Sequence, residues 1–171
     1  MIAKIHMTTA DRKRTELVKG KEVNFTYLPP EEVRDFAKVT SVCVIPFTED
    51  GQIVATIIDR GIDFPGGHVQ EGETSLQETA DREAMEEACI TLHPVKVVSY
   101  IESDFYGSEP DQLTYMVVTT AKVKDIFPFT PNEEAHGREI LSPEAFLERF
   151  KNLAPEDAKY LIEAALKLIK L

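Results

Sequence analysis

The stretch GGHVQEGETSLQETADREAMEEACI, residues 66–90, gathers two glycine turns, a helix start and a row of glutamates within a short span. Gly66 and Gly67 follow a proline, so the backbone can turn sharply there and come close to a ligand. Thr74 and Ser75 are candidate N-caps, because amide and acidic side chains follow three residues later, as in a capping box. The residues from there to about position 88 are mostly strong helix formers, which predicts a helix.

Three glutamates, Glu83, Glu86 and Glu87, stand at positions i, i+3 and i+4 of this helix, so their side chains share one face. Each pair of like charges at this spacing costs roughly 0.2–0.5 kcal/mol. The negative end of the helix dipole adds roughly 0.3–1 kcal/mol per charge. A divalent cation between the carboxylates would remove this conflict, and hard ions such as Mg²⁺ take oxygen ligands. A solvated acidic face is the alternative, but the glycine turns before the helix favour a metal site.

The stretch resembles the Nudix box, in which a glycine and a glutamate precede a helix with the pattern Arg-Glu-apolar-any-Glu-Glu-any-Gly-apolar. Gly67 and Glu73 stand at the distance that the box requires, residues 82–88 (REAMEEA) match its core, and Ile90 matches its final apolar position. Two departures stand out. Eight residues, where the box has seven, separate Glu73 from the arginine. Cys89 replaces the closing glycine, which costs on the order of 1 kcal/mol if the helix ends in a left-handed residue.

The resemblance implies a Nudix-type α/β/α sandwich with a mixed β-sheet. It also implies hydrolysis of a nucleoside diphosphate linked to another moiety, with Mg²⁺ or Mn²⁺ as the cofactor. Matched position by position to the box, the metal ligands would be the carboxylates of Glu83, Glu86 and Glu87 and the backbone carbonyl of Gly67. The substrate would be a small nucleotide or polyphosphate.

The same resemblance assigns Arg82 the role of pairing with and orienting the box carboxylates, Glu73 among them. The general base varies within the family and comes either from the box or from a later loop. In this chain the candidates are Glu83 and Glu86 in the box and Glu133 and Glu134 in the loop. A catalytically weak nucleotide-binding or sensor module is the alternative function, and only the extra residue before Arg82 and the cysteine at position 89 favour it.

Several other side chains could contact a substrate, although each has an ordinary structural interpretation. A loop cation and two histidines could bind phosphate or support a glutamate, and four aromatic residues could stack on a base. Large aromatic side chains are nevertheless mostly buried in cores. These candidates are Arg60, His68, His136, Phe64, Tyr106, Phe127 and Phe129.

The net charge of −11 is unevenly distributed, with +2 over residues 1–38 and −13 over residues 39–171. An acidic surface repels the nucleic-acid backbone and anionic membranes, which disfavours long nucleic acids and membranes as partners. Cys43 and Cys89 have no metal-binding or paired spacing, which is typical of a reducing cytoplasm. No apolar run reaches the length of a membrane span, and no export signal is evident.

The chain of 171 residues suits a single domain. Residues 1–38 form an N-terminal extension: residues 11–14 are expected to be a solvated turn, 22–27 a strand and about 30–38 a short helix. This extension could add to the fold or contribute to a homodimer contact. The predicted core, residues 39–171, has strands at 39–47, 52–58, 92–102 and 113–123. It ends in helices at 143–150 and 155–171, the first capped by Ser142.

Overall fold

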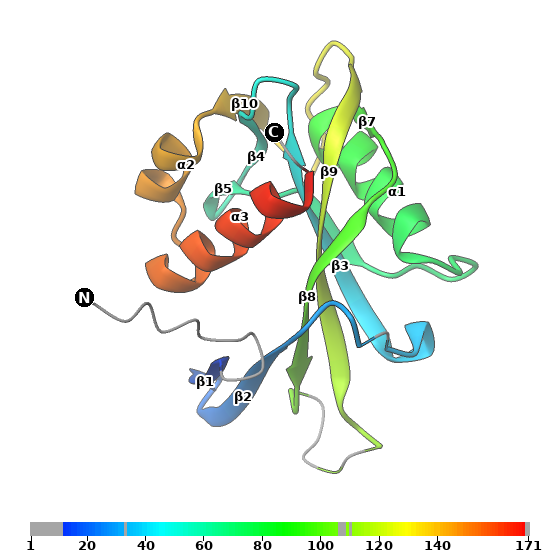
Figure 1. The fold of residues 1–171 in the computed structure, drawn as a ribbon, viewed down its shortest axis with the longest axis vertical. Helices are drawn as coiled ribbons and strands as arrows, with labels where there is room; N and C mark the ends of the chain where they lie inside the picture. The colour runs from blue at the N-terminus through cyan, green and yellow to red at the C-terminus, as the bar shows by residue number, and fades with distance from the viewer. Residues whose placement is uncertain (1–11, 33, 106–108, 110, 170–171) are drawn as a thin grey trace.

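The structure, a computed structural model, describes residues 12–32, 34–105, 109 and 111–169 (Figure 1). Its helices are the short 3-10 helix η2 (Phe36–Lys38) and the α-helices α1 (Leu76–Ala88), α2 (Pro143–Arg149) and α3 (Pro155–Ile169). Its strands are β1 (Arg12–Val18), β2 (Lys21–Leu28), β3 (Val39–Phe47), β4 (Ile53–Ile58), β5 (Gly61–Asp63), β6 (Gly66–His68), β7 (Ile90–Leu92), β8 (Lys96–Ser103), β9 (Thr114–Ile126) and β10 (Gly137–Leu141).

The strands form one mixed sheet in the order β1-β2-β8-β9-β3-β4-β10. The short strands β5, β6 and β7 pair with β4, β3 and β9, respectively. Strands β3 and β9 run parallel, and the other pairs are antiparallel. The strand predicted at 92–102 is two strands, because the segment around Pro94 separates β7 from β8. The short strands β5 and β6 lead the chain from β4 to the start of α1.

Helix α1 covers one face of the sheet, and α2 and α3 cover the other (Figure 1). Strand β3 shows why: its side chains alternate between the two faces, as the pleat of a strand requires. Val42 and Val44 belong to the core beneath α1, whereas Ile45 and Phe47 belong to the core beneath α2 and α3. Two hydrophobic cores on either side of one sheet make up the α/β/α sandwich that the resemblance implied.

The N-terminal extension differs from its prediction. The solvated turn expected at residues 11–14 is wrong for residues 12–14, which begin β1; residue 11 lies outside the described residues. Strand β1 forms an antiparallel hairpin with β2 around Lys19 and Gly20, both of which have positive φ. Backbone pairing with β2 makes this segment a strand although its side chains are charged. The predicted strand at 22–27 is confirmed as β2.

The helix predicted at about 30–38 is also wrong: among the described residues of this range, only Phe36–Lys38 is helical, and it forms a 3-10 turn. The side chain of Asp35 accepts a hydrogen bond from the backbone N–H of Ala37 at 3.0 Å, which caps this short turn. The chain then enters β3 directly. Because β2 pairs with β8, the hairpin extends the main sheet. A homodimer contact through the extension stays a prediction.

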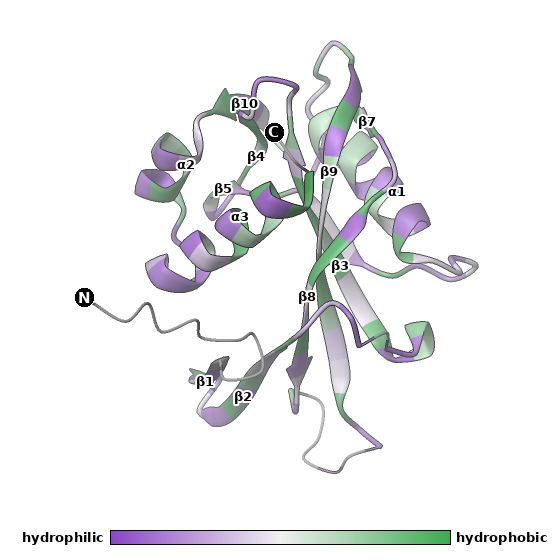
Figure 2. Ribbon diagram, viewed as in Figure 1, coloured by the Kyte–Doolittle hydropathy of each residue, from purple (hydrophilic) through white to green (hydrophobic). Residues whose placement is uncertain are grey.

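The two C-terminal helices form as the sequence predicts. The hydroxyl of Ser142 accepts a hydrogen bond from the N–H of Ala145 at 3.2 Å and caps α2, whose first residue is Pro143. Both α2 and α3 carry hydrophilic and hydrophobic positions in Figure 2, as amphipathic helices do. Within the described ranges, no helix combines the length and the apolar character needed to cross a membrane.

Candidate active site

The start of α1 is fixed by local hydrogen bonds. Ser75 is the N-cap, and its hydroxyl accepts a bond from the N–H of Glu78 at 3.3 Å. The carboxylate of Glu78 in turn accepts a bond from the N–H of Thr74 at 2.6 Å. This reciprocal arrangement is close to the predicted capping box. It sets the register of the helix and thereby decides which face carries the glutamates.

The glycine turn lies directly against this helix. Strand β6 pairs with β3, and a side chain at Gly66 would place its Cβ 2.6 Å from Cα of Cys43. A Cβ at Gly67 would lie 2.5 Å from Oε1 of Glu83. The N–H of Gly66 donates a hydrogen bond to Oε2 of Glu87 at 2.9 Å. The two glycines therefore permit an approach between backbone and carboxylates that any other residue would obstruct.

Arg82 is the centre of an ion-pair network. Its Nε donates to Glu73 at 2.6 Å, and its Nη1 donates to Glu83 at 2.6 Å and to Glu86 at 2.9 Å. Its Nη2 donates to the backbone carbonyl of His68 at 2.8 Å. The hydrogen bond from Arg82 lowers the pKa of Glu73 to about 2. The extra residue before Arg82 therefore does not prevent the two side chains from meeting.

At the end of α1, Cys89 occupies the position where the box has a glycine. Cys89 is the C-cap and adopts the left-handed conformation, with φ 51° and ψ 48°. Its N–H donates to the carbonyl of Met85 at 3.1 Å. A glycine adopts this conformation without a steric penalty, whereas a residue with a Cβ does not. The cysteine thus preserves the geometry of the box at some loss of stability.

The structure brings three carboxylates together, from two separate segments. Oxygen atoms of Glu83, Glu87 and Glu134 all lie within 4.8 Å of one another. Glu83 and Glu87 are buried, with 4% and 7% of their surface exposed, and Glu134 is exposed. The third box glutamate, Glu86, is half-exposed and points to Arg82 at the edge of this cluster. The box therefore supplies two members of the cluster and the late loop supplies the third.

The environment of this cluster disfavours negative charge. Burial, reinforced by the charges of Glu83, Glu134 and Asp63, raises the pKa of Glu87 to about 7 against the opposing hydrogen bond from Gly66. Burial also raises the pKa of Glu83, although Arg82 counteracts it. Buried carboxylates in mutual repulsion are stabilised when a cation neutralises them. The donor set consists of oxygen atoms alone, which fits a hard divalent ion.

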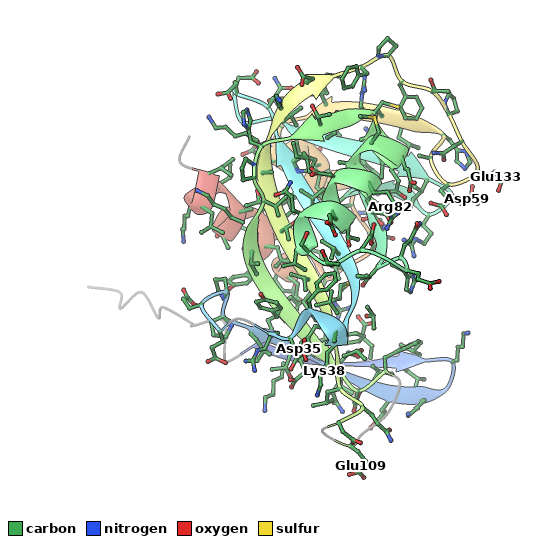
Figure 3. All side chains as sticks on the ribbon, turned by 90° about the vertical axis from the view of Figure 1, so that its right-hand side faces the viewer. Asp35, Lys38, Asp59, Arg82, Glu109 and Glu133 are labelled. Carbon is green, nitrogen blue, oxygen red and sulfur yellow. The ribbon has the colours of Figure 1, made fainter. Side chains whose placement is uncertain are left out.

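These carboxylates line a cavity of about 590 Å³. Figure 3 shows Arg82, Asp59 and Glu133 in the upper half of the molecule, while Asp35, Lys38 and Glu109 lie in the lower half. The lining includes each site residue that the box and the late loop indicated, except Glu73, which contacts the lining through Arg82. Its lining residues are Ile58, Asp59, Arg60, Gly66, Gly67, His68, Gln70, Arg82, Glu83, Glu86, Glu87, Glu133 and Glu134.

Two of the other described candidates line the cavity, and His136 contacts the lining residue Asp59, with its Nε2 2.7 Å from Oδ1. Arg60 and His68 are part of the lining, and the Arg60 side chain is 71% exposed. Phe64 is buried and stacks on Phe146 with their ring centroids 4.5 Å apart, so it belongs to the core. The described lining residues include neither Phe127 nor Phe129, and Tyr106 lies outside the described residues.

Asp63, Asn132 and Arg138 lie next to the site without lining its cavity, and no sequence pattern singled them out. Asp63 is partly buried behind Glu87, and its carboxylate accepts hydrogen bonds from the N–H of Phe64 and from Asn152. Asn132 and Arg138 bind backbone carbonyls at the end of α1. Because these contacts join segments that are far apart in the sequence, no local spacing could have revealed them.

The comparisons with known proteins agree with this geometry. The family model of the NUDIX domain matches residues 37–164, which is well over half of the chain. The chain therefore belongs to the Nudix family. This confirms the prediction, from the box, of a Nudix hydrolase. A comparison with curated protein sequences finds no match.

Solved structures show the same fold at low sequence identity. A mutant of the pyrophosphohydrolase BsRppH from Bacillus subtilis is 20% identical, with a TM-score of 0.63 over 85% of this chain and 89% of that one. The Nudix domain of NrtR from Shewanella oneidensis, solved with ADP-ribose, is 17% identical, with a TM-score of 0.58 over 81% and 92%. An ADP-ribose pyrophosphatase from Streptococcus suis is 21% identical, with a TM-score of 0.53 over 72% and 89%.

Proposed function

We propose that this protein hydrolyses a diphosphate bond in a nucleoside diphosphate derivative, with Mg²⁺ or Mn²⁺ as the cofactor. The observation that carries the proposal is the cluster of Glu83, Glu87 and Glu134, whose oxygen atoms lie within 4.8 Å of one another beside a glycine turn. Carboxylates this close and this buried are unfavourable alone and suited to a cation. The cavity around them is open to a small substrate.

The residues that would hold the metal are Glu83, Glu87 and Glu134, with Glu86 and the backbone carbonyl of Gly67 as the further ligands that the box implies. When bound, a divalent ion neutralises charge on phosphate oxygens and lowers the pKa of a bound water. Arg82 restrains Glu83 and Glu86 by direct hydrogen bonds and is itself held by Glu73. Rigid ligands of this kind hold a metal centre in its productive geometry.

The general base belongs to one of two groups of glutamates in this proposal. Glu83 and Glu86 both accept hydrogen bonds from Nη1 of Arg82, at 2.6 and 2.9 Å. Glu133 and Glu134 line the cavity from the late loop and are exposed. A base has to lie within hydrogen-bond reach of the attacking water. Glu134 meets this requirement best among the loop residues, because it belongs to the carboxylate cluster.

The substrate in this proposal is bound through its phosphates. Arg82 is already bonded to three carboxylates and a carbonyl, so it offers little to a ligand. Arg60 projects from the same cavity and is largely exposed, with one weak contact to Asp63 at 3.3 Å. A guanidinium group in this position suits phosphate oxygens. In this proposal the cavity combines a metal site with a largely exposed cation at its rim.

Hydrolysis of a substrate panel with and without Mg²⁺ tests the proposal. The panel contains nucleoside triphosphates, ADP-ribose, nucleotide sugars and dinucleoside polyphosphates, assayed at mildly alkaline pH. We expect one class to be cleaved only with the metal, and Glu87→Gln to abolish the cleavage while the protein stays folded. Nucleotide binding without any cleavage would instead support the alternative, a sensor module of the Nudix fold. The intact pair of Arg82 and Glu73 supports the hydrolase.

A further inference from the structure

The last turn of α1 is bound by side chains from outside the helix. The final carbonyls of any helix lack partners within it and need other donors. Here the carbonyl of Glu86 accepts a bond from Nδ2 of Asn132 at 2.7 Å, and that of Ala88 accepts one from Nη1 of Arg138 at 2.8 Å. The carbonyl between them, that of Glu87, accepts a bond from Thr56 in β4 at 3.0 Å.

Asn132 also shapes the loop that carries Glu134, residues 127–136 between β9 and β10. Its Oδ1 accepts hydrogen bonds from the N–H groups of Glu134 at 2.9 Å and Ala135 at 2.7 Å. Its own N–H donates to the carbonyl of Ala135 at 3.0 Å, which closes the turn. Ala135 is fully buried, so the turn is packed as well as hydrogen-bonded. One amide side chain therefore joins the Glu134 turn to the helix of the metal ligands.

Arg138 binds the other end of the same loop. Its Nη1 donates to the carbonyl of Phe127 at 2.8 Å as well as to that of Ala88. The guanidinium group also lies over the ring of Phe129, 5.9 Å from its centroid. A positive charge at the negative end of a helix is favourable. The beginning and the end of the loop are thus held at the same point of α1.

We propose that Asn132 and Arg138 are positioning residues of the active site, which hold Glu134 beside Glu83 and Glu87 by binding the last carbonyls of α1. Glu86 and Glu87 supply both side chains to the site and carbonyls to this end of the helix. The loop is therefore bonded to Glu86 and Ala88, the two residues that flank Glu87 along the helix. Outer residues that orient metal ligands change metal affinity or activity by about 10–100-fold when they are replaced.

The test is a double-mutant cycle on metal affinity, since the proposal rests on the metal site of the proposed function. The affinity of the folded protein for Mn²⁺ is measured by calorimetry in the wild type, Asn132→Ala, Glu134→Gln and the double variant. We expect each single variant to weaken binding by about tenfold or more, and the double variant to bind no more weakly than Glu134→Gln. Non-additivity of this kind shows that Asn132 acts through Glu134. Additive losses would overturn the proposal.

A matched control separates positioning from simple destabilisation. Ser142→Ala removes the N-cap of α2, away from the loop, and we expect it to lower the melting temperature by about 2–4 °C. Its Mn²⁺ affinity should equal that of the wild type. Arg138→Gln should weaken Mn²⁺ binding even at temperatures where it is as fully folded as this control. Wild-type affinity in both Asn132→Ala and Arg138→Gln would also overturn the proposal.

Glu87→Gln distinguishes failure of this inference from failure of the proposed function. If Glu87→Gln and Glu134→Gln both bind Mn²⁺ as the wild type does, the metal site itself is wrong. If only Glu87→Gln loses affinity, Glu134 is not held on the metal and the positioning role fails alone. Where the substrate is known, the turnover number gives a second readout. We expect kcat of Asn132→Ala to fall with little change in KM, because Asn132 does not line the cavity.

Discussion

Arg82 and Glu73 form an ion pair, with Nε 2.6 Å from Oε1, although eight residues separate them and Glu73 precedes the helix that carries Arg82. This pair connects the turn before α1 to the glutamate face. The arginine side chain is only 19% exposed, and its Nε and Nη1 atoms both pair with carboxylates. Arg82 therefore ties the position of the box carboxylates to the turn before the helix.

Glu73→Gln should weaken catalysis without removing a metal ligand. The neutral amide cannot hold the guanidinium as strongly, so Arg82 and its partners lose their orientation. We expect kcat/KM to fall by about 10–100-fold, measured by steady-state kinetics on the substrate from the panel. Glu71→Gln, an exposed glutamate of the same turn that does not line the cavity, is the control and should retain wild-type activity. Equal activity in both variants would show that the ion pair is dispensable.

The ion pair of Arg82 and Glu73 should also affect the stability of the protein in acid. The carboxyl pKa of Glu73 is lowered from 4.5 to about 2 in the folded protein. A depressed pKa contributes stability above the unfolded value, and this stability is lost as the pH falls from 4.5 toward 2. Chemical denaturation at several pH values should show a smaller acid loss for Glu73→Gln than for the wild type. Parallel curves would contradict the prediction.

The pKa of Glu87 is shifted in the opposite direction from that of Glu73. Its pKa is raised from 4.5 to about 7, so the metal-free folded protein binds a proton that the unfolded chain has released. Stability should therefore decrease as the pH rises from 4.5 to 7 and should not decrease further from this group above that range. Glu87→Gln should remove this loss, so that metal-free variant and wild type differ more at pH 8 than at pH 5. Thermal unfolding in a chelator measures this difference.

The burial of these carboxylates also predicts how the stabilising effect of added Mg²⁺ depends on pH. Mg²⁺ binds the ionised carboxylates and stabilises the folded state in proportion to its occupancy. We expect the rise in melting temperature on adding Mg²⁺ to be larger at pH 8 than at pH 5. A rise of the same size at both pH values would indicate binding that is independent of Glu83 and Glu87. At pH 8, Mg²⁺ should also raise the melting temperature of Glu87→Gln less than that of the wild type.

Cys89→Gly should stabilise the protein. The left-handed conformation of residue 89 costs roughly 1–2 kcal/mol for a residue with a Cβ, although a glycine also gives the unfolded chain more freedom. We expect a net gain of about 1 kcal/mol, or about 2–4 °C in melting temperature. Cys89→Ala keeps the Cβ and loses the thiol, so it separates the two effects and should bring no gain. Destabilisation by glycine would show that the thiol contributes contacts.

Arg60 should affect substrate binding more than the chemical step. Its side chain is 71% exposed at the rim of the cavity, where it can bind phosphate equally in the ground state and the transition state. Arg60→Gln is expected to raise KM by about tenfold and leave kcat within about twofold. Lys159→Gln, an exposed cation on α3, should leave both constants unchanged. A fall in kcat at constant KM would place Arg60 in the chemical step instead.

The predicted parts of the site are those that depend on local spacing. The alternation of turn formers, caps and helix formers over residues 66–90 predicted α1, an N-cap at Thr74 or Ser75, and the glutamate face. Strand β2 and the C-terminal helices followed from similarly local patterns. Strand β1 did not, since its charged side chains resemble a turn and only pairing with β2 makes it a strand. The helix predicted before β3 was wrong for a different reason: helix propensity is weak over so few residues.

The sequence by itself determined the local features of the candidate site: one helix, one glycine turn, and glutamates spaced to share a face. Only the tertiary structure decided which carboxylates meet. It joined Glu134 to Glu83 and Glu87, turned Glu86 toward Arg82, and placed Asn132 and Arg138 on the end of α1. Spacing along a helix sets which side chains share a face. The distance between two segments depends on the packing of the sheet between them, which no local pattern encodes.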